Sequence, residues 1–205
     1  TVAVDSQNRL YVIHEGRAEQ KDHPSVFVFD EKGDFVRAFG SEFQGGGHGL
    51  EVRKEAGGEF LYITGYQQVK KIAKFILEGE KVWEKFAPVA SGLYAAGEDT
   101  KPEKVWGRDR FMPTNFAFLP DGGYYVADGY GSYTVLQYDK DGNWVRTIGT
   151  PGKEDGQFAL PHGVWIDDRK ADDPLLVVAD RANARLQWFD LEGKHRRTMK
   201  DFILP

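Results

Sequence analysis

The sequence contains no cysteine. Disulfide bonds, thiolate metal sites and cysteine nucleophiles are therefore excluded, while the redox compartment stays open because reducing and oxidising compartments both hold such proteins. Long hydrophobic runs are also missing, since the apolar stretches are short and are interrupted by charged side chains. A membrane-spanning helix needs about 20 consecutive apolar residues, so we expect no membrane span.

Positive charge is not in excess either. The chain has 27 Lys and Arg against 32 Asp and Glu, which gives a formal net charge of -5. General nucleic-acid binders and proteins held on anionic membranes need a dense positive field, so the composition argues against both classes. A peptide or small-molecule substrate, or a protein partner, remains as the expected ligand.

The chain nevertheless has enough apolar material for a real core. Hydrophobic residues make up 40% and aromatic residues 14% of its 205 residues, which argues against global disorder. The first residue is Thr1, inside a strand-like pattern, and no signal peptide is visible. The end of the chain, 200–205, repeats the phrase of 155–161. We therefore expect a fragment or a processed chain in which 201–205 lead into a fifth repeat.

One phrase of four short strand-like runs occurs four times, approximately over 1–47, 48–86, 114–161 and 162–200. The first runs align at Thr1, Gly49, Asn115 and Gly163, so the spacings are 48, 66 and 48 residues. The long spacing contains a Gly-, Pro- and charge-rich insertion at 87–110. Four-stranded units at this period are typical of β-propeller blades, whereas a β-sandwich, the alternative, does not repeat one phrase. We predict an all-β propeller with four blades present.

Two histidines precede equivalent inner strands of this predicted propeller. His48 stands before the first strand of the second unit and His162 before that of the fourth, while Thr114 has this place in the third. Inner strands surround the axis, so these side chains should converge. Neutral imidazole is a common metal ligand, and zinc takes three or four such donors. The two rings therefore either share an axial metal ion or only hydrogen-bond the backbone of a neighbouring blade.

In the third and fourth units the second strand ends in the sequence Val-Ala-Asp, at 126–128 and 178–180. With this motif the repeat resembles the NHL repeat, and the resemblance extends over essentially the whole chain. Further phrases, in this order, are similar to those of the peptidyl-α-hydroxyglycine α-amidating lyases, which are six-bladed NHL propellers. They are Gly-His-Gly-Leu (47–50), Pro-Thr-Asn (113–115), Asp-Gly-Tyr (128–130), Gly-Gln-Phe-Ala-Leu-Pro-His (156–162) and Ala-Asp-Arg (179–181). The resemblance implies that the chain holds the first four of six blades.

The resemblance also implies a function. His48 and His162 match two of three zinc ligands, Tyr130 matches a catalytic tyrosine that acts as general base, and Arg181 matches an arginine that stabilises it or the substrate. The backbone carbonyls of Val2 and Leu50 match ligands of a structural calcium ion. The family cleaves the N–C bond of a C-terminal α-hydroxyglycine and releases a peptide amide and glyoxylate. An extracellular or periplasmic location is the corresponding expectation.

This chain departs from the family pattern at one position. In the family an arginine that holds the substrate carboxylate follows the histidine matching His14, whereas this chain has Glu15. The third zinc histidine would lie beyond Pro205. Two other hypotheses therefore stay open: a non-catalytic NHL scaffold that binds a peptide or protein on one face, and a propeller resembling sugar-lactone hydrolases, whose metal sites usually need acidic ligands.

Each of the two candidate catalytic residues also has a simpler structural interpretation. Tyr130 is an aromatic side chain on a blade surface in this interpretation, and Arg181 forms an ion pair with Asp128 or Asp180.

Overall fold

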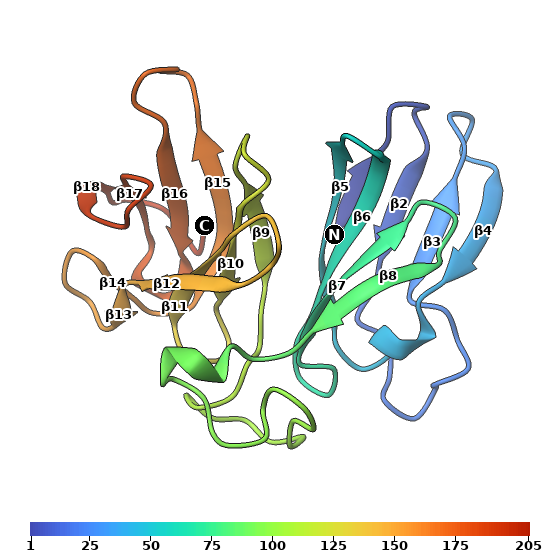
Figure 1. Ribbon diagram of the computed structural model, residues 1–205, viewed down its shortest axis with the longest axis horizontal. Coiled ribbons are helices and arrows are strands. Elements are labelled where there is room, and N and C mark those ends of the chain that lie inside the picture. The colour runs from blue at the N-terminus through green and yellow to red at the C-terminus, as the bar shows by residue number, and fades with distance from the viewer.

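The computed structural model describes residues 1–205 and contains 18 strands, three short 3₁₀ turns and no α-helix. Sixteen of the strands form four antiparallel sheets of four, and each sheet follows the order of its strands in the chain. Figure 1 shows these sheets as successive blades. The prediction of an all-β propeller with four blades is confirmed. No helix is both long enough and apolar enough to cross a membrane.

The strands of the four blades follow the predicted runs closely. The first blade consists of β1 (Val2–Val4), β2 (Leu10–Ile13), β3 (Val26–Phe29) and β4 (Phe35–Phe39). The second consists of β5 (Gly47–Glu55), β6 (Gly58–Gly65), β7 (Lys71–Ile76) and β8 (Lys81–Lys85). The third consists of β9 (Asn115–Phe118), β10 (Tyr124–Asp128), β11 (Thr134–Tyr138) and β12 (Trp144–Ile148). The fourth consists of β15 (Pro161–Asp167), β16 (Leu175–Asp180), β17 (Arg185–Phe189) and β18 (His195–Met199).

The turn between the third and fourth strands shows why the repeat is visible in the sequence. In the first blade the Asp30 carboxylate accepts hydrogen bonds from the backbone N–H groups of Lys32 and Asp34, both at 2.9 Å. Gly33 between them has φ 87°, which favours glycine. Asp139 and Asp190 accept the equivalent bonds in the third and fourth blades. An Asp and a Gly at fixed spacing therefore mark the end of each of these hairpins.

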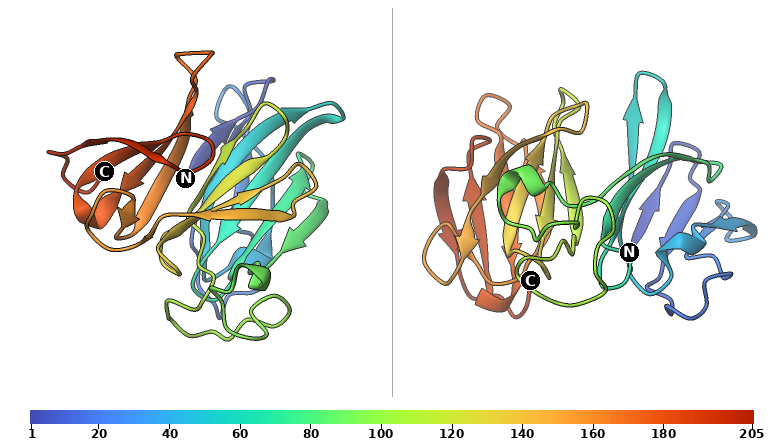
Figure 2. Two further views of the ribbon diagram at one scale, coloured as in Figure 1. Left: turned by 60° about the vertical axis from the view of Figure 1, so that its left-hand side comes forward. Right: turned by 60° about the horizontal axis from the view of Figure 1, so that its bottom comes forward.

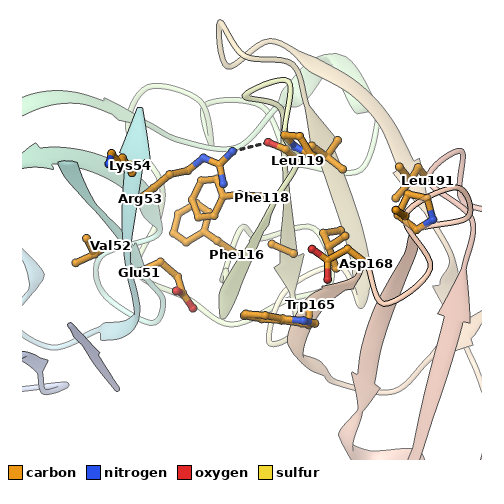
Figure 3. A pocket seen from close by; sticks show the side chains of 15 residues that line it. Glu51, Val52, Arg53, Lys54, Phe116, Phe118, Leu119, Trp165, Asp168 and Leu191 are labelled. Carbon is orange, nitrogen blue, oxygen red and sulfur yellow. Dashed lines mark hydrogen bonds between the residues drawn. The ribbon is translucent and has the colours of Figure 1, made fainter. Parts of the chain in front are cut away.

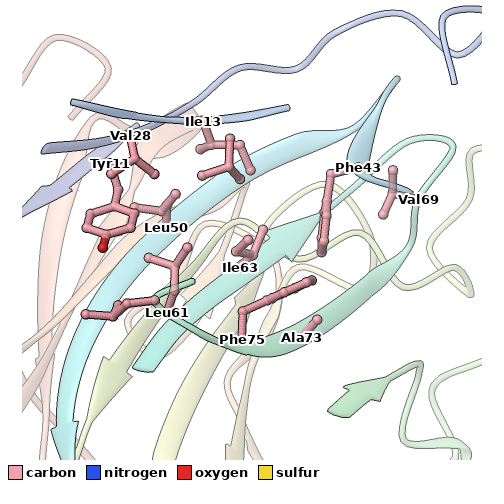
Figure 4. Packing of buried hydrophobic residues seen from close by; sticks show 12 residues of the cluster. Tyr11, Ile13, Val28, Phe43, Leu50, Leu61, Ile63, Val69, Ala73 and Phe75 are labelled. Atoms are coloured by element: carbon pink, nitrogen blue, oxygen red, sulfur yellow. The ribbon is translucent and has the colours of Figure 1, made fainter. Parts of the chain in front are cut away.

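The cores lie between neighbouring blades. Figure 4 shows Tyr11 and Val28 of the first blade packed against side chains of the second, such as Leu50 and Phe75. A second cluster joins the second and third blades, and a third cluster joins the third and fourth. Burying one such side chain contributes about 1.5–3 kcal/mol, so each blade depends for its stability on its neighbour.

The insertion at 87–110 lies at one end of the molecule, the lower end in Figure 1, and the second view of Figure 2 shows it from below. Its regular structure is one 3₁₀ turn, η2 (Val89–Ser91). The side chain of Glu98 is fully buried and accepts hydrogen bonds from Arg110 Nη1 at 3.0 Å and from the N–H of Phe111 at 3.2 Å. Lys70 Nζ lies 3.9 Å from the same carboxylate. These contacts hold the insertion against the second and third blades.

Two features were not predicted. Before the fourth blade, β13 (Thr150–Pro151) and β14 (Gln157–Phe158) form a short parallel pair. In addition, β5 and β15 begin earlier than the hydrophobic pattern indicated, at Gly47 and Pro161, so that His48 and His162 lie within the strands rather than before them. The reason is that strand pairing continues past a local irregularity at each histidine, which no hydrophobic pattern reveals.

Candidate functional site

His48 and His162 occupy equivalent β-bulges. The pairing of β5 with β6 shifts register between Gly47 and Leu50, and the pairing of β15 with β16 shifts between Pro161 and Val164. A bulge bends its strand and redirects a side chain out of the normal alternation. At each bulge, near the start of an inner strand, the histidine side chain therefore points away from the core between the blades.

The two imidazoles lie next to each other, edge to face. Their ring centroids lie 4.8 Å apart, with an angle of 67° between the ring planes. His48 Nδ1 lies 2.9 Å from the carbonyl oxygen of Thr114. A carbonyl only accepts, so this contact requires the proton on Nδ1 and leaves the lone pair on Nε2. The hydrogen bond to a neighbouring blade, which was the simpler alternative, thus exists and also orients the ring for a second partner.

The surroundings of both histidines favour the neutral imidazole. Burial lowers the pKa of His48, and the charge of Arg181 lowers it further. Burial also lowers the pKa of His162 to about 4, with additional effects of His48 and Arg181. A metal ion binds only unprotonated imidazole, so this pair needs no loss of a proton before it binds one.

Tyr130 belongs to the same cluster. Its phenol oxygen lies 3.3 Å from His162 Nε2, and its ring centroid lies 5.7 Å from that of His48. The side chain therefore faces the axial site and is not simply an aromatic residue on a blade surface. A proton acceptor placed here would reach a group bound beside the imidazoles.

Asp128, the last residue of β10, shapes the turn that carries Tyr130. Its carboxylate is fully buried and accepts hydrogen bonds from the N–H groups of Met112 and Ser132 and from the Tyr94 hydroxyl, each at 2.7 Å. These bonds fix the chain on both sides of the turn. Gly131 is required as well, because a Cβ there would collide with the Arg110 carbonyl and with the Asp128 carboxylate.

Arg181 follows Asp180 at the end of β16 and begins the 3₁₀ turn η3 (Arg181–Asn183). Asp180 accepts hydrogen bonds from Asn183 Nδ2 at 2.8 Å and from Arg185 Nε at 2.7 Å. Arg181 takes part in no ion pair, so the pairing with Asp128 or Asp180 does not occur. Its positive charge contributes, after the larger effect of burial, to lowering the pKa of both histidines.

Thr114 joins three blades at the centre of this arrangement. Its hydroxyl donates to the carbonyl oxygen of His162 at 2.7 Å, and its own carbonyl accepts from the Thr64 hydroxyl at 2.8 Å. Thr64 in turn accepts from the N–H of Gly49 at 2.6 Å. The residues around both bulges are thus tied into one hydrogen-bonded unit, which fixes the spacing of the two imidazoles.

Two aromatic residues of the site were missed by the sequence analysis. The ring centroid of Tyr66 lies 5.1 Å from that of His48 and 4.8 Å from that of Tyr130. Trp106, from the insertion, lies 5.9 Å from Tyr130. Tyr66 carried a usable signal, because it follows its blade's second strand, as Arg181 follows β16. Trp106 carried none, because the insertion has no counterpart in the other blades.

Glu15 also lies at the site. Its carboxylate accepts a hydrogen bond from Gln67 Nε2 at 2.8 Å. Its charge partly opposes the lowering of the His48 pKa by burial. Burial, and to a smaller extent the charge of Glu15, raise the pKa of Tyr66 to about 12. The position at which this chain departs from the lyase pattern therefore contributes a negative charge close to the imidazoles.

The donors for a metal ion are incomplete within these 205 residues. No group of three or more His, Cys, Asp or Glu side chains is arranged to hold an ion. Two neutral, adjacent imidazoles suit two of the positions that zinc takes, and at least one donor must come from elsewhere. Val2 and Leu50 lie on β1 and β5, which are in contact. A calcium ion at their carbonyls stays a prediction.

A separate cavity of about 680 Å³ lies at the other ends of the inner strands. Figure 3 shows Glu51 and Arg53 of β5, Phe116 of β9 and Trp165 of β15 around it. The imidazoles mark the starts of the same strands, so the cavity and the candidate site occupy opposite ends of the axis. The cavity contains none of the residues named by the lyase resemblance.

Sequence comparison matches the chain to known amidating enzymes. The chain is 25% identical over 220 residues to peptidylglycine alpha-amidating monooxygenase of Rattus norvegicus, an alignment that covers 94% of this chain and 20% of that protein. It is 34% identical over 79 residues to a probable peptidyl-alpha-hydroxyglycine alpha-amidating lyase of Caenorhabditis elegans, which covers 38% of this chain and 22% of that protein. The chain resembles the amidating lyases.

Two further comparisons concern the type of repeat and the fold. NHL repeat-containing protein 3 of Homo sapiens is 26% identical over 92% of this chain and 51% of its own length, in agreement with repeats of the NHL type. A streptogramin B lyase structure superposes with a TM-score of 0.63 over 97% of this chain and 53% of that one, at 12% identity, which concerns the fold alone. No family model matches the chain. This chain spans about a fifth of the length of the amidating enzymes that it matches.

Proposed function

We propose that this lyase-like NHL propeller cleaves peptidyl-α-hydroxyglycine at an axial zinc site and releases a peptide amide and glyoxylate. The proposal rests on one observation above all: the Tyr130 hydroxyl lies 3.3 Å from His162 Nε2, while the His48 ring lies 4.8 Å from that of His162. A proton acceptor therefore adjoins the two imidazoles that are suited to a metal ion.

His48 and His162 would hold the ion, together with a donor from outside these residues. When bound, zinc acts as a Lewis acid that makes the substrate hydroxyl easier to deprotonate. The Nδ1 bond of His48 to Thr114 orients its ring, as outer hydrogen bonds commonly do for histidine ligands.

Tyr130 would then carry the proton through the reaction. In its phenolate form it accepts the proton of the substrate hydroxyl. The oxygen lone pair forms the C=O bond of glyoxylate, the N–C bond breaks, and its electron pair goes to the amide nitrogen. Tyr130 returns the proton to that nitrogen, so atoms and charge balance. Arg181, which forms no ion pair, would have the role that the resemblance assigns to it, stabilising this tyrosine or the substrate.

The proposal is tested by glyoxylate release from an N-acylated peptidyl-α-hydroxyglycine. We expect the full-length protein to release glyoxylate and peptide amide in equal amounts, to lose this activity on chelation, and to regain it with zinc. A loss of bound zinc in His162→Ala, measured by metal analysis, would tie the ion to this site. Metal-replete protein that releases no glyoxylate would contradict the proposal.

Glu15 leads to a separate prediction. The product glyoxylate carries a carboxylate, and so does the substrate that yields it, so the negative charge of Glu15 should weaken substrate binding. Glu15 is exposed. Removing one exposed charge changes interaction energies by about 0.2–1 kcal/mol, which corresponds to a gain in kcat/KM of about 1.4- to 5-fold for Glu15→Gln. Glu15→Arg should gain more. The measurement is kcat/KM at two salt concentrations, and an unchanged value at low salt for both variants would contradict the prediction.

The alternative function is a non-catalytic NHL scaffold that binds a peptide or protein on this face. The negative charge of Glu15, at the position where the lyase pattern has an arginine for the substrate carboxylate, favours it. If metal-replete protein turns over no α-hydroxyglycine substrate and Glu15→Arg restores nothing, the scaffold becomes the better account.

A further inference from the structure

Trp106 is a large apolar side chain that is exposed to solvent. It is 58% exposed, and the preceding Val105 is 47% exposed. Single exposed apolar residues need no explanation, but this one adjoins the candidate catalytic tyrosine. Its ring centroid lies 5.9 Å from that of Tyr130 and 6.3 Å from that of Tyr66, and it stands at 90° and 89° to them.

The three rings form one wall, here called the aromatic wall (Tyr66, Trp106 and Tyr130). The ring centroids of Tyr66 and Tyr130 lie 4.8 Å apart with their planes 32° apart. Tyr66 is only 8% exposed and lies behind the partly exposed Tyr130, so Tyr130 and Trp106 provide the accessible part of the wall. Trp106 stands edge-on to both tyrosine rings. Edge-to-face contacts of this kind are favourable, and the exposed ring of Trp106 can make a further one with an aromatic or large apolar side chain.

The backbone on both sides of Trp106 is held in place. The carbonyl of Val105 accepts a hydrogen bond from Lys70 Nζ at 2.6 Å. Arg108 Nη1 donates to the carbonyl of Gly131 at 2.5 Å, and its guanidinium lies 3.2 Å from the centre of the Tyr133 ring. Lys70 is itself buried beside Glu98. A binding surface on a segment fixed in this way loses little conformational entropy when a ligand binds.

We propose that the aromatic wall selects substrates whose residue immediately before the α-hydroxyglycine is aromatic or large and apolar. The inference rests on the proposed function, because it takes Tyr130 as the reacting end. Consecutive Cα atoms are 3.8 Å apart, so the preceding side chain is within reach of a ring about 6 Å from Tyr130. In this proposal Trp106 is a specificity-determining residue. It makes an apolar contact with the side chain that precedes the α-hydroxyglycine, and this contact does not depend on a charge on that side chain.

The test measures binding separately from turnover. Dissociation constants of two unreactive peptides, N-acetyl-Phe-Gly and N-acetyl-Ala-Gly, are determined by calorimetry with the full-length protein. We expect Phe to bind about fivefold to twentyfold more tightly than Ala, from the buried apolar area and the ring contact. Trp106→Ala should reduce this ratio below about threefold, and Trp106→Phe should retain most of it.

Trp165→Ala is the matched control. Trp165 is 66% exposed, comparable to Trp106, but it lines the cavity at the opposite end of the axis. Its removal should leave the Phe-to-Ala ratio unchanged. A ratio near one in the wild type, or a ratio that survives Trp106→Ala, overturns the inference.

The same proteins are assayed with the two corresponding α-hydroxyglycine peptides, so that the two proposals can fail separately. Glyoxylate release without a preference for Phe would leave the proposed function standing and remove the specificity inference. A Phe preference in binding that depends on Trp106, without any glyoxylate release, would leave the peptide-binding wall and remove the lyase.

Discussion

Replacing Tyr130 by phenylalanine is expected to lower kcat for glyoxylate release by about 10²–10⁴-fold, the usual contribution of a general acid–base group. The hydroxyl is the one atom lost, and it lies 3.3 Å from His162 Nε2. The ring contacts with Tyr66 and Trp106 remain, so KM should change little. A loss confined to kcat indicates an interaction made only in the transition state. Steady-state kinetics on the two proteins measures both constants.

Tyr133→Phe serves as the control for this variant. Tyr133 lies three residues further along the same turn and stacks under Arg108, and its hydroxyl makes no hydrogen bond within the chain. Its removal should leave kcat within about twofold, as expected for a surface change away from the reacting atoms. If Tyr130→Phe were equally harmless, Tyr130 would not be the proton carrier, and the proposed mechanism would fail even if glyoxylate is released.

Replacing Asp128 by alanine is expected to cost about 3–5 kcal/mol in the free energy of unfolding. The substitution leaves the N–H groups of Met112 and Ser132 and the hydroxyl of Tyr94 without their acceptor in a buried place. Each unsatisfied buried donor costs about 1–3 kcal/mol, and relaxation of the turn recovers part of the sum. Denaturant unfolding of the full-length protein, followed by fluorescence, measures the loss.

Asp139 provides a matched comparison within the same blade. Its carboxylate also accepts three hydrogen bonds, from the N–H groups of Asp141 and Asn143 and from the Asn143 side chain. These donors are exposed, so water replaces the carboxylate in Asp139→Ala and the loss of stability should be much smaller. Equal losses in the two variants would show that burial of the donors around Asp128 is not what makes this residue important.

Asp128 also connects stability with the site. Its bonds to Met112 and Ser132 hold the two chain segments that meet at the Tyr130 turn. A conservative Asp128→Asn variant that folds should therefore lose activity, because an amide cannot accept all three donors. Asp128, the strand-end aspartate of the Val-Ala-Asp phrase, is thus a structural residue in the same turn as the candidate catalytic Tyr130.

The sequence by itself determined the blades. The four strands of each blade were predicted from a repeated series of runs rich in β-branched and aromatic residues, and from turns such as that around Asp30 and Gly33. In that turn the Asp30 carboxylate accepts bonds from N–H groups within four residues, which imposes the residue types. The histidine pair was also predictable, because a repeat places equivalent residues at equivalent positions around an axis. Local interactions leave a local pattern, so the sequence was sufficient for these features.

Only the tertiary structure decided how the site is composed. The bulges at His48 and His162 arise from pairing with neighbouring strands, and the proton position on His48 follows from a carbonyl 66 residues away, at Thr114. Trp106 reaches Tyr130 because Glu98, buried among contacts from two blades, holds an insertion that has no periodicity of its own. Contacts between segments far apart in the chain depend on packing, which no single segment of the sequence encodes.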